Sequence, residues 1–194
     1  MFFLQRDEIG SFLRSKYQAL MNKTSKIFPI DVINLDYDGN ISKNHVPISE
    51  TIELIFKCQA LHQKNFSLFI TWPHTEAEDE QTYKDSLKKI IEDNLEDPQA
   101  KTFKTLFDQS HTSVANLDYE RLSIIGLSKI IIQHSSTNKF NLHKNEFFIY
   151  GEKNRRRMFS ILMNFNFQNT KSKHILYSGD VHKALDKVTD LSIT

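Results

Sequence analysis

Two short apolar segments on either side of a helical segment constrain this chain most, because together they predict a pair of parallel strands. Residues 30–35 are almost continuously apolar and partly β-branched, as in a strand covered on both faces. Residues 66–71 form a second such segment, which Trp72-Pro73 is expected to close. Ser49 is a suitable cap for a helix that runs to about residue 62. Strand, helix and strand at this spacing predict a right-handed parallel βαβ unit.

The pattern changes to strict alternation toward the C-terminus. In residues 158–167, Phe, Ile and Met alternate with Ser, Leu and Asn, a period of two that is typical of a strand. Residues 147–150 precede a polar turn at 151–157, so the two segments predict an antiparallel hairpin. Helical periodicity predicts four further helices, at residues 9–21, 76–95, 100–107 and 117–133.

The fold class that we predict is therefore α/β, with a Rossmann-like sheet of parallel strands and a C-terminal antiparallel hairpin. We expect an N-terminal helix in residues 1–28, the Rossmann-like domain in residues 29–170 and a tail in residues 171–194. Because the strand at residue 30 would stand at an edge of this sheet, we also expect a protein partner or self-association.

Composition narrows the classes of function. A hydrophobic content of 39% is that of a globular protein, and the formal charge of +1 provides no global attraction to nucleic acid or to anionic membranes. The single cysteine, Cys58, excludes an internal disulfide framework, and its apolar neighbours favour a buried side chain over a nucleophile. No apolar run approaches the roughly 20 residues of a membrane span. These features predict a cytoplasmic protein without a membrane partner.

The residues with the strongest chemical potential follow the two predicted parallel strands. Asp36-Tyr37-Asp38-Gly39-Asn40 comes directly after the first strand, and Thr71 ends the second. Open parallel sheets bind ligands just beyond the carboxyl ends of their strands. We therefore expect Asp36, Asp38 and Thr71 to lie together at the centre of any site.

The order of elements from residue 30 to residue 167 resembles the second half of a class I S-adenosylmethionine-dependent methyltransferase, in which two strands with their helices precede a terminal antiparallel hairpin. The motifs are most similar to those of the tRNA guanine dimethyltransferase group, whose strands end in Asp-x-Asp-Pro-Tyr-Gly and in Thr. Asn34-Leu35-Asp36-Tyr37-Asp38-Gly39 stands at the first place and Phe69-Ile70-Thr71 at the second. Tyr119-Glu120-Arg121, which opens an apolar helix, also resembles that family. Asn34 replaces the first Asp of the motif, and Tyr37-Asp38 replaces Pro-Tyr.

The resemblance implies a site for a nucleic-acid base. Asp36 would hold the amino or imino edge of the base, and Gly39 would allow close approach of the backbone. Trp72 or Tyr37 would stack on a flipped base. The remaining substrate-binding candidates beside this turn are Asn34 and Asn40.

The cofactor site of such enzymes lies on their first two strands, after a glycine-rich loop. Gly10 is the only glycine before Asp36, so that loop has no counterpart here. The resemblance thus implies an incomplete or degenerate methyltransferase-like domain that acts as a subunit of a larger complex. S-adenosylmethionine would bind only with a partner that supplies the other half.

A second family provides an alternative. Residues 32–40 are similar to the Asp-x-Asp-Gly-Thr strand end of haloacid-dehalogenase-type phosphatases. Asp36 would then be the nucleophile and Asp38 the general acid, with Mg²⁺ neutralising the carboxylates and the phosphate. Thr71 would hold a phosphoryl oxygen, Lys153 would match the lysine motif, and Ser178-Gly179-Asp180 would match the last acidic motif. That fold needs a helix where residues 158–167 alternate, so the alternation favours the methyltransferase-like interpretation.

A third interpretation is a non-enzymatic interaction module in which residues 36–40 form only a polar turn. Nucleic acid remains a candidate partner through a cationic patch whose neighbours Phe147, Phe148 and Phe159 we assign to the core. A solvated hairpin turn explains the same charges. The patch consists of Lys153, Arg155, Arg156 and Arg157.

Overall fold

A computed structural model describes residues 8–22, 27–37, 47–73, 81–98, 101–151 and 158–168. The predicted tail at 171–194 and residues 76–80 of one predicted helix lie outside these ranges. The elements in chain order are α1 (Glu8–Met21), β1 (Val32–Asp36), α2 (Ile48–His62), β2 (Phe66–Pro73), α3 (Gln81–Glu96), α4 (Lys101–Ser110), the short 3-10 helix η3 (Val114–Asn116), α5 (Tyr119–Thr137), β3 (Phe140–Tyr150) and β4 (Met158–Phe167).

The four described strands form one mixed sheet in the order β1-β2-β4-β3. β1 and β2 are parallel, with Asp36 opposite Thr71. β4 is antiparallel both to β2 and to β3. The predicted parallel pair and the predicted hairpin are thus confirmed, and the fold class is α/β with a mixed sheet. β3 begins at Phe140, earlier than the sequence pattern indicated. The pattern missed the first half of this strand because that half is largely polar and its alternation is interrupted by a register shift between Leu142 and Lys144.

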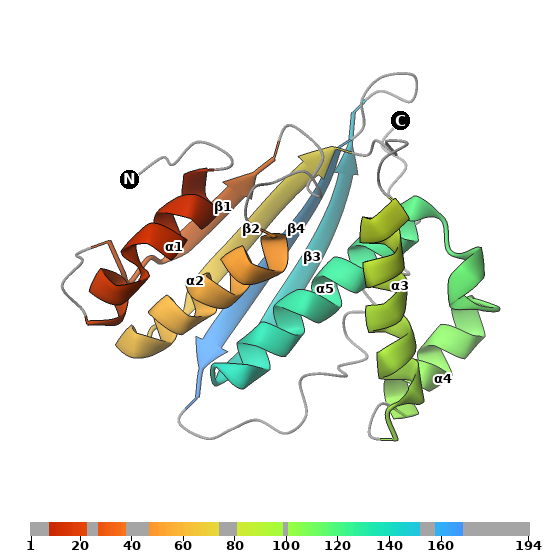
Figure 1. Cartoon of the computed structure of the whole chain (residues 1–194). Coiled ribbons are helices and arrows are strands. Elements are labelled where there is room, and N and C mark those ends of the chain that lie inside the picture. Colours follow the sequence, from red (N-terminus) through yellow and green to blue (C-terminus); the bar gives the residue numbers. More distant parts are fainter. Residues whose placement is uncertain are drawn as a thin grey trace.

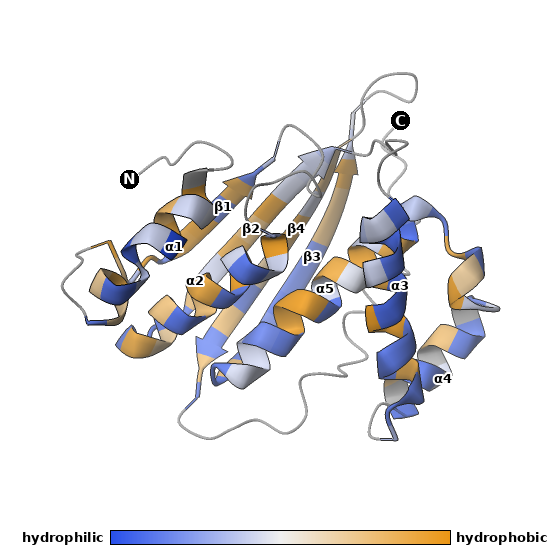
Figure 2. Cartoon of the chain, viewed as in Figure 1, coloured by the Kyte–Doolittle hydropathy of each residue, from blue (hydrophilic) through white to orange (hydrophobic). Residues whose placement is uncertain are grey.

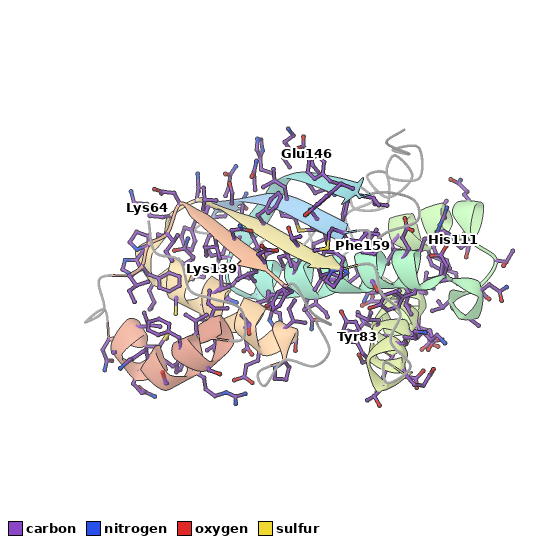
Figure 3. The ribbon with its side chains drawn as sticks, turned by 90° about the horizontal axis from the view of Figure 1, so that it is seen from above. Lys64, Tyr83, His111, Lys139, Glu146 and Phe159 are labelled. Atoms are coloured by element: carbon purple, nitrogen blue, oxygen red, sulfur yellow. The ribbon has the colours of Figure 1, made fainter. Side chains whose placement is uncertain are left out.

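The described helices lie on one side of the sheet, with α1, α2 and α5 in front of the strands in Figure 1. The view from above in Figure 3 shows the same two layers, with Glu146 projecting from β3 on the side away from the helices. We name this second side, on which no described helix lies, the open face. Our expectation that the first strand is covered on both faces is wrong, because Val32 is 64% exposed and Asn34 and Asp36 are exposed too. Only Ile33 and Leu35 of that strand are buried.

The core lies between the sheet and the helix layer. Figure 2 shows hydrophobic and hydrophilic residues alternating along the strands, as expected when one side of a sheet is buried. Phe56 of α2 packs on three rings of the sheet, with ring centroids 4.9 to 5.5 Å apart. The pairs with Phe66 and Phe165 are edge-to-face, a geometry that adds about 0.5–1.5 kcal/mol each beyond the buried area. The three rings are those of Phe66, Phe140 and Phe165.

The helix starts show where local sequence did and did not decide the structure. Asp118 caps α5, and its side chain accepts a 2.8 Å hydrogen bond from Arg121 N. Ser49 was predicted to cap α2 but lies inside it, because the helix begins at Ile48 after Pro47. No side-chain hydrogen bond caps that helix start. α1 packs on α2, and Arg14 of α1 forms a bidentate ion pair with Glu50 of α2 at the surface.

Helices α3, α4 and α5 form a second packed group beside the sheet. A side chain at Gly126 of α5 would meet Leu87 of α3, since an added Cβ would lie 2.7 Å from Leu87 Cδ2. Lys129 of α5 is only 2% exposed, and its Nζ lies 3.7 Å from the ring centre of Phe103 of α4. Burial lowers the pKa of Lys129 to about 7. Cys58 is buried as expected, and burial raises the pKa of its thiol to about 11.

Candidate functional site

A row of side chains crosses the open face at the carboxyl ends of the parallel strands. The row starts with Asp36 at the end of β1 and continues through its cross-strand partner Thr71 on β2. Ser160 of β4 pairs with Thr71, and Phe148 of β3 pairs with Ser160. Neighbouring strands are about 4.8 Å apart, so the row spans roughly 14 Å. Sequence reasoning placed the first two of these residues together, and the register confirms that they are neighbours.

Two buried hydroxyl groups form the middle of this row. Thr71 Oγ1 and Ser160 Oγ are 2.8 Å apart, and the two residues are 5% and 2% exposed. The backbone fixes the same place, because Tyr37 N donates a 2.8 Å hydrogen bond to Thr71 O and so holds the chain just beyond Asp36. Asp36 itself is exposed to solvent. The row therefore places an exposed carboxylate beside a buried, hydrogen-bonded pair of hydroxyls.

The two aromatic residues that were expected to stack on a base do not face the open side. Trp72 is 1% exposed and packs on Phe159 with ring centroids 5.4 Å apart, on the helix side of the sheet. It continues β2 instead of closing it, since the strand runs to Pro73. Tyr37 is 5% exposed. Period-two alternation explains Trp72, because it shares the inward side of β2 with Ile70.

Other rings occupy the open face. Phe148 and Tyr150 of β3 are 38% and 41% exposed. The assignment of Phe148 to the core is wrong, whereas Phe147 and Phe159, at 4% and 1% exposure, are core residues as expected. Because β3 alternates, the inward position of Phe147 assigns Phe148 to the other side, a signal that the sequence already contained.

Ser160 was not identified as a site residue from sequence. Its alternation with Phe159 and Ile161 was visible and implied an outward side chain. Its pairing with Thr71 depends on the antiparallel register of two strands 89 residues apart, which local sequence does not specify. Of the other site residues predicted from sequence, Asn34 is exposed on the open face. The other three, Asp38, Gly39 and Asn40, lie outside the described ranges.

The groups that would bind phosphate or metal are only partly within the described residues. Lys153, Arg155–Arg157 and Ser178-Gly179-Asp180 lie outside them. Among the residues that are described, no cluster of three or more His, Cys, Asp or Glu side chains could hold a metal ion. Nor does any helix in the described ranges have the length and apolar character required to cross a membrane.

The described residues do not fit S-adenosylmethionine by themselves. Gly10, the only glycine before Asp36, lies within helix α1 and is therefore not part of a loop that follows a strand. No described strand precedes β1. No family model, no curated protein and no solved structure matches this chain.

Proposed function

We propose that this chain is a Rossmann-like, class I methyltransferase-like domain that holds a nucleic-acid base and works as a subunit beside a partner that supplies the cofactor site. One observation carries the proposal. The elements follow the order strand, helix, strand, helices and antiparallel hairpin within one sheet, and Asp36 and Thr71 lie side by side at its carboxyl edge. The resemblance of their motifs to those of the tRNA guanine dimethyltransferase group supplies the substrate class.

In this proposal Asp36 accepts hydrogen bonds from the amino or imino edge of the base. A carboxylate accepts and does not donate, so it selects bases that present N–H groups at that edge. The Thr71–Ser160 hydroxyl pair forms the floor beside it. Phe148 stands three strand spacings away, which suits stacking on a neighbouring nucleotide and not on the base that Asp36 holds. The described residues do not fit the cofactor by themselves, so methyl transfer would depend on the partner.

The strand conformation of residues 158–167 supports this proposal over the phosphatase alternative. That alternative required a helix in this interval. Asp36 and Thr71, which the phosphatase alternative also uses, are adjacent here as well, so the conformation of residues 158–167 is what separates the two.

Base recognition is tested by fluorescence anisotropy with a labelled, guanine-containing single-stranded RNA. We expect Asp36→Asn to weaken binding about tenfold, in line with the 1–3 kcal/mol of a good base contact. The matched control is Asp31→Asn, which removes an exposed carboxylate just before the opposite end of β1. Both variants lose one negative charge, so the difference between them isolates the base contact. Equal affinity of the two variants would refute the role of Asp36.

The cofactor part of the proposal has its own test. Titration calorimetry of the chain alone with S-adenosylmethionine should show no binding. Tight binding by the isolated chain would contradict the need for a partner, whatever the outcome of the RNA experiment.

A further inference from the structure

One side of the β1 backbone has no strand partner among the residues that the structure describes. Ser67 N donates to Asp31 O and Tyr37 N donates to Thr71 O, each at 2.8 Å. In a parallel ladder alternate residues bond to a given neighbour, so the odd-numbered residues of 31–37 face β2. The even-numbered residues point their N–H and C=O groups toward the outer edge of the sheet. These residues are Val32, Asn34 and Asp36.

The chain closes one end of this edge with a side chain. Ile30 continues the even-numbered series, and the fully buried amide of Gln59 binds both of its backbone groups. Gln59 Oε1 accepts from Ile30 N at 3.0 Å, and its Nε2 donates to Ile30 O. In the described part of the chain, no side chain binds the outward backbone groups of Val32, Asn34 and Asp36 in this way. The open edge therefore begins at Val32.

The opposite edge of the same sheet is built differently. β3 has a register shift after Leu142 and carries an ion pair between Lys144 and Glu146. Bulges and charged side chains of this kind discourage pairing with another strand. β1 has a regular register of five pairs, and residues 32–36 contain no lysine, arginine or proline. Of the two edges, β1 has neither a register shift nor a lysine, and its only charged side chain is that of Asp36.

We propose that β1 is completed by an extended segment of a different protein, which adds as a strand along Val32, Asn34 and Asp36. The segment would carry apolar side chains beside Ile33 and Leu35, on the side where Figure 1 shows α1 in front of β1. Polar side chains would alternate with them on the open face. Main-chain hydrogen bonds would provide affinity, and the alternating side chains would provide specificity. The idea that this partner also supplies the cofactor half rests on the proposed function. The inference that β1 accepts an added strand does not rest on it.

A second copy of this chain fits the edge less well. The antiparallel pairing that uses all three residues is centred on Asn34 and sets Val32 opposite Asp36 of the other copy. An apolar side chain opposite a carboxylate gives no favourable cross-strand pair. The two α1 helices would also converge above the joined edge. A strand with its own alternation avoids both problems.

Hydrogen exchange on the purified full chain tests whether the edge is free. We expect the amides of Asn34 and Asp36 to exchange at least 100-fold faster than that of Tyr37, which donates to β2. Slow exchange of both amides in dilute solution would overturn the proposal, since the chain would then cover its own edge. Slow exchange that appears only at high protein concentration would overturn it in favour of a second copy.

Strand addition is tested with a synthetic peptide of the β2 sequence, residues 66–72, flanked by lysines for solubility. This sequence already pairs with β1 in parallel on the inner side. Anisotropy should show binding that Asn34→Pro weakens at least tenfold, because proline removes an outward N–H and leaves the β2 ladder intact. Val32→Pro is the second variant. Whichever proline variant unfolds at the same temperature as the wild type is the one whose peptide binding decides the test. His143→Asn, at an exposed position of the far strand β3, is the control and should bind normally.

Failure of the wild-type chain to bind the peptide, or equal binding by wild type and the folded proline variant, would refute strand addition at β1. The RNA experiment with Asp36→Asn does not depend on this edge, so failure of one proposal is distinguishable from failure of the other.

Discussion

Replacing Lys129 by methionine should stabilise this protein at pH 6 and have little effect near pH 10. Lys129 is 2% exposed, and burial lowers its pKa from 10.5 to about 7. At about 1.36 kcal/mol per pH unit, that difference corresponds to about 5 kcal/mol against the charged, folded form. The ring of Phe103 offsets about 2 kcal/mol through its contact with Nζ. The net gain that we expect from Lys129→Met below pH 7 is therefore at most about 3 kcal/mol.

The pH dependence follows from the sign of this shift. The pKa of Lys129 is lower in the folded than in the unfolded chain, so between about pH 7 and pH 10.5 the unfolded chain binds more protons. The free energy of unfolding of the wild type therefore rises with pH in this window, by at most about 1.4 kcal/mol per unit. Lys129→Met lacks this contribution. The difference between variant and wild type should shrink steadily across the window.

The assay is urea unfolding at pH 6, 8 and 9.5, followed by the fluorescence of the single tryptophan, Trp72, which is buried in the core. Lys104→Met is the matched control, because Lys104 is an exposed lysine of the neighbouring helix α4. Its effect should stay within about 0.5 kcal/mol at every pH. A Lys129→Met variant that is less stable than wild type at pH 6, or whose effect does not change with pH, would refute this reasoning.

Three further predictions concern packing and buried hydrogen bonds. Gly126→Ala should lower the free energy of unfolding by about 1–2 kcal/mol, because the new Cβ would lie 2.7 Å from Leu87 Cδ2 and overpacking outweighs the gain in helix propensity; unchanged stability in thermal unfolding would contradict the close approach. Ser128→Ala, on the same helix, should be neutral or stabilising by about 1 kcal/mol, because its buried hydroxyl has no hydrogen-bond partner within the described residues; a clear loss in the same assay would show that the hydroxyl is bonded. Thr71→Val should cost about 1–3 kcal/mol by orphaning the Ser160 hydroxyl, and adding Ser160→Ala should restore most of it; additive losses in the double-mutant cycle would show that the two hydroxyls are not coupled.

Sequence periodicity was sufficient for most of the elements. The alternation in residues 158–167 became β4, the apolar segment at 66–71 became β2, and the helical periodicity at 117–133 became α5. These signals are local, because each depends on which sides of one helix or strand are apolar. The neighbouring positions of Asp36 and Thr71 also followed, since a parallel βαβ unit brings its two carboxyl ends together.

The rest required tertiary structure, because it depends on which strands become neighbours and on which side of the sheet the helices lie. Nothing local states that β4 inserts beside β2, and that insertion sets Ser160 against Thr71. The apolar run at 30–35 resembled a strand buried on both sides, yet only one side is covered, so Val32 faces solvent and Asp36 stands on an open face. Gln59 closes the backbone of Ile30 from a helix 29 residues away. Chain order thus determined the elements of this protein, while the packing of the sheet decided which side chains face solvent and which edge is left open.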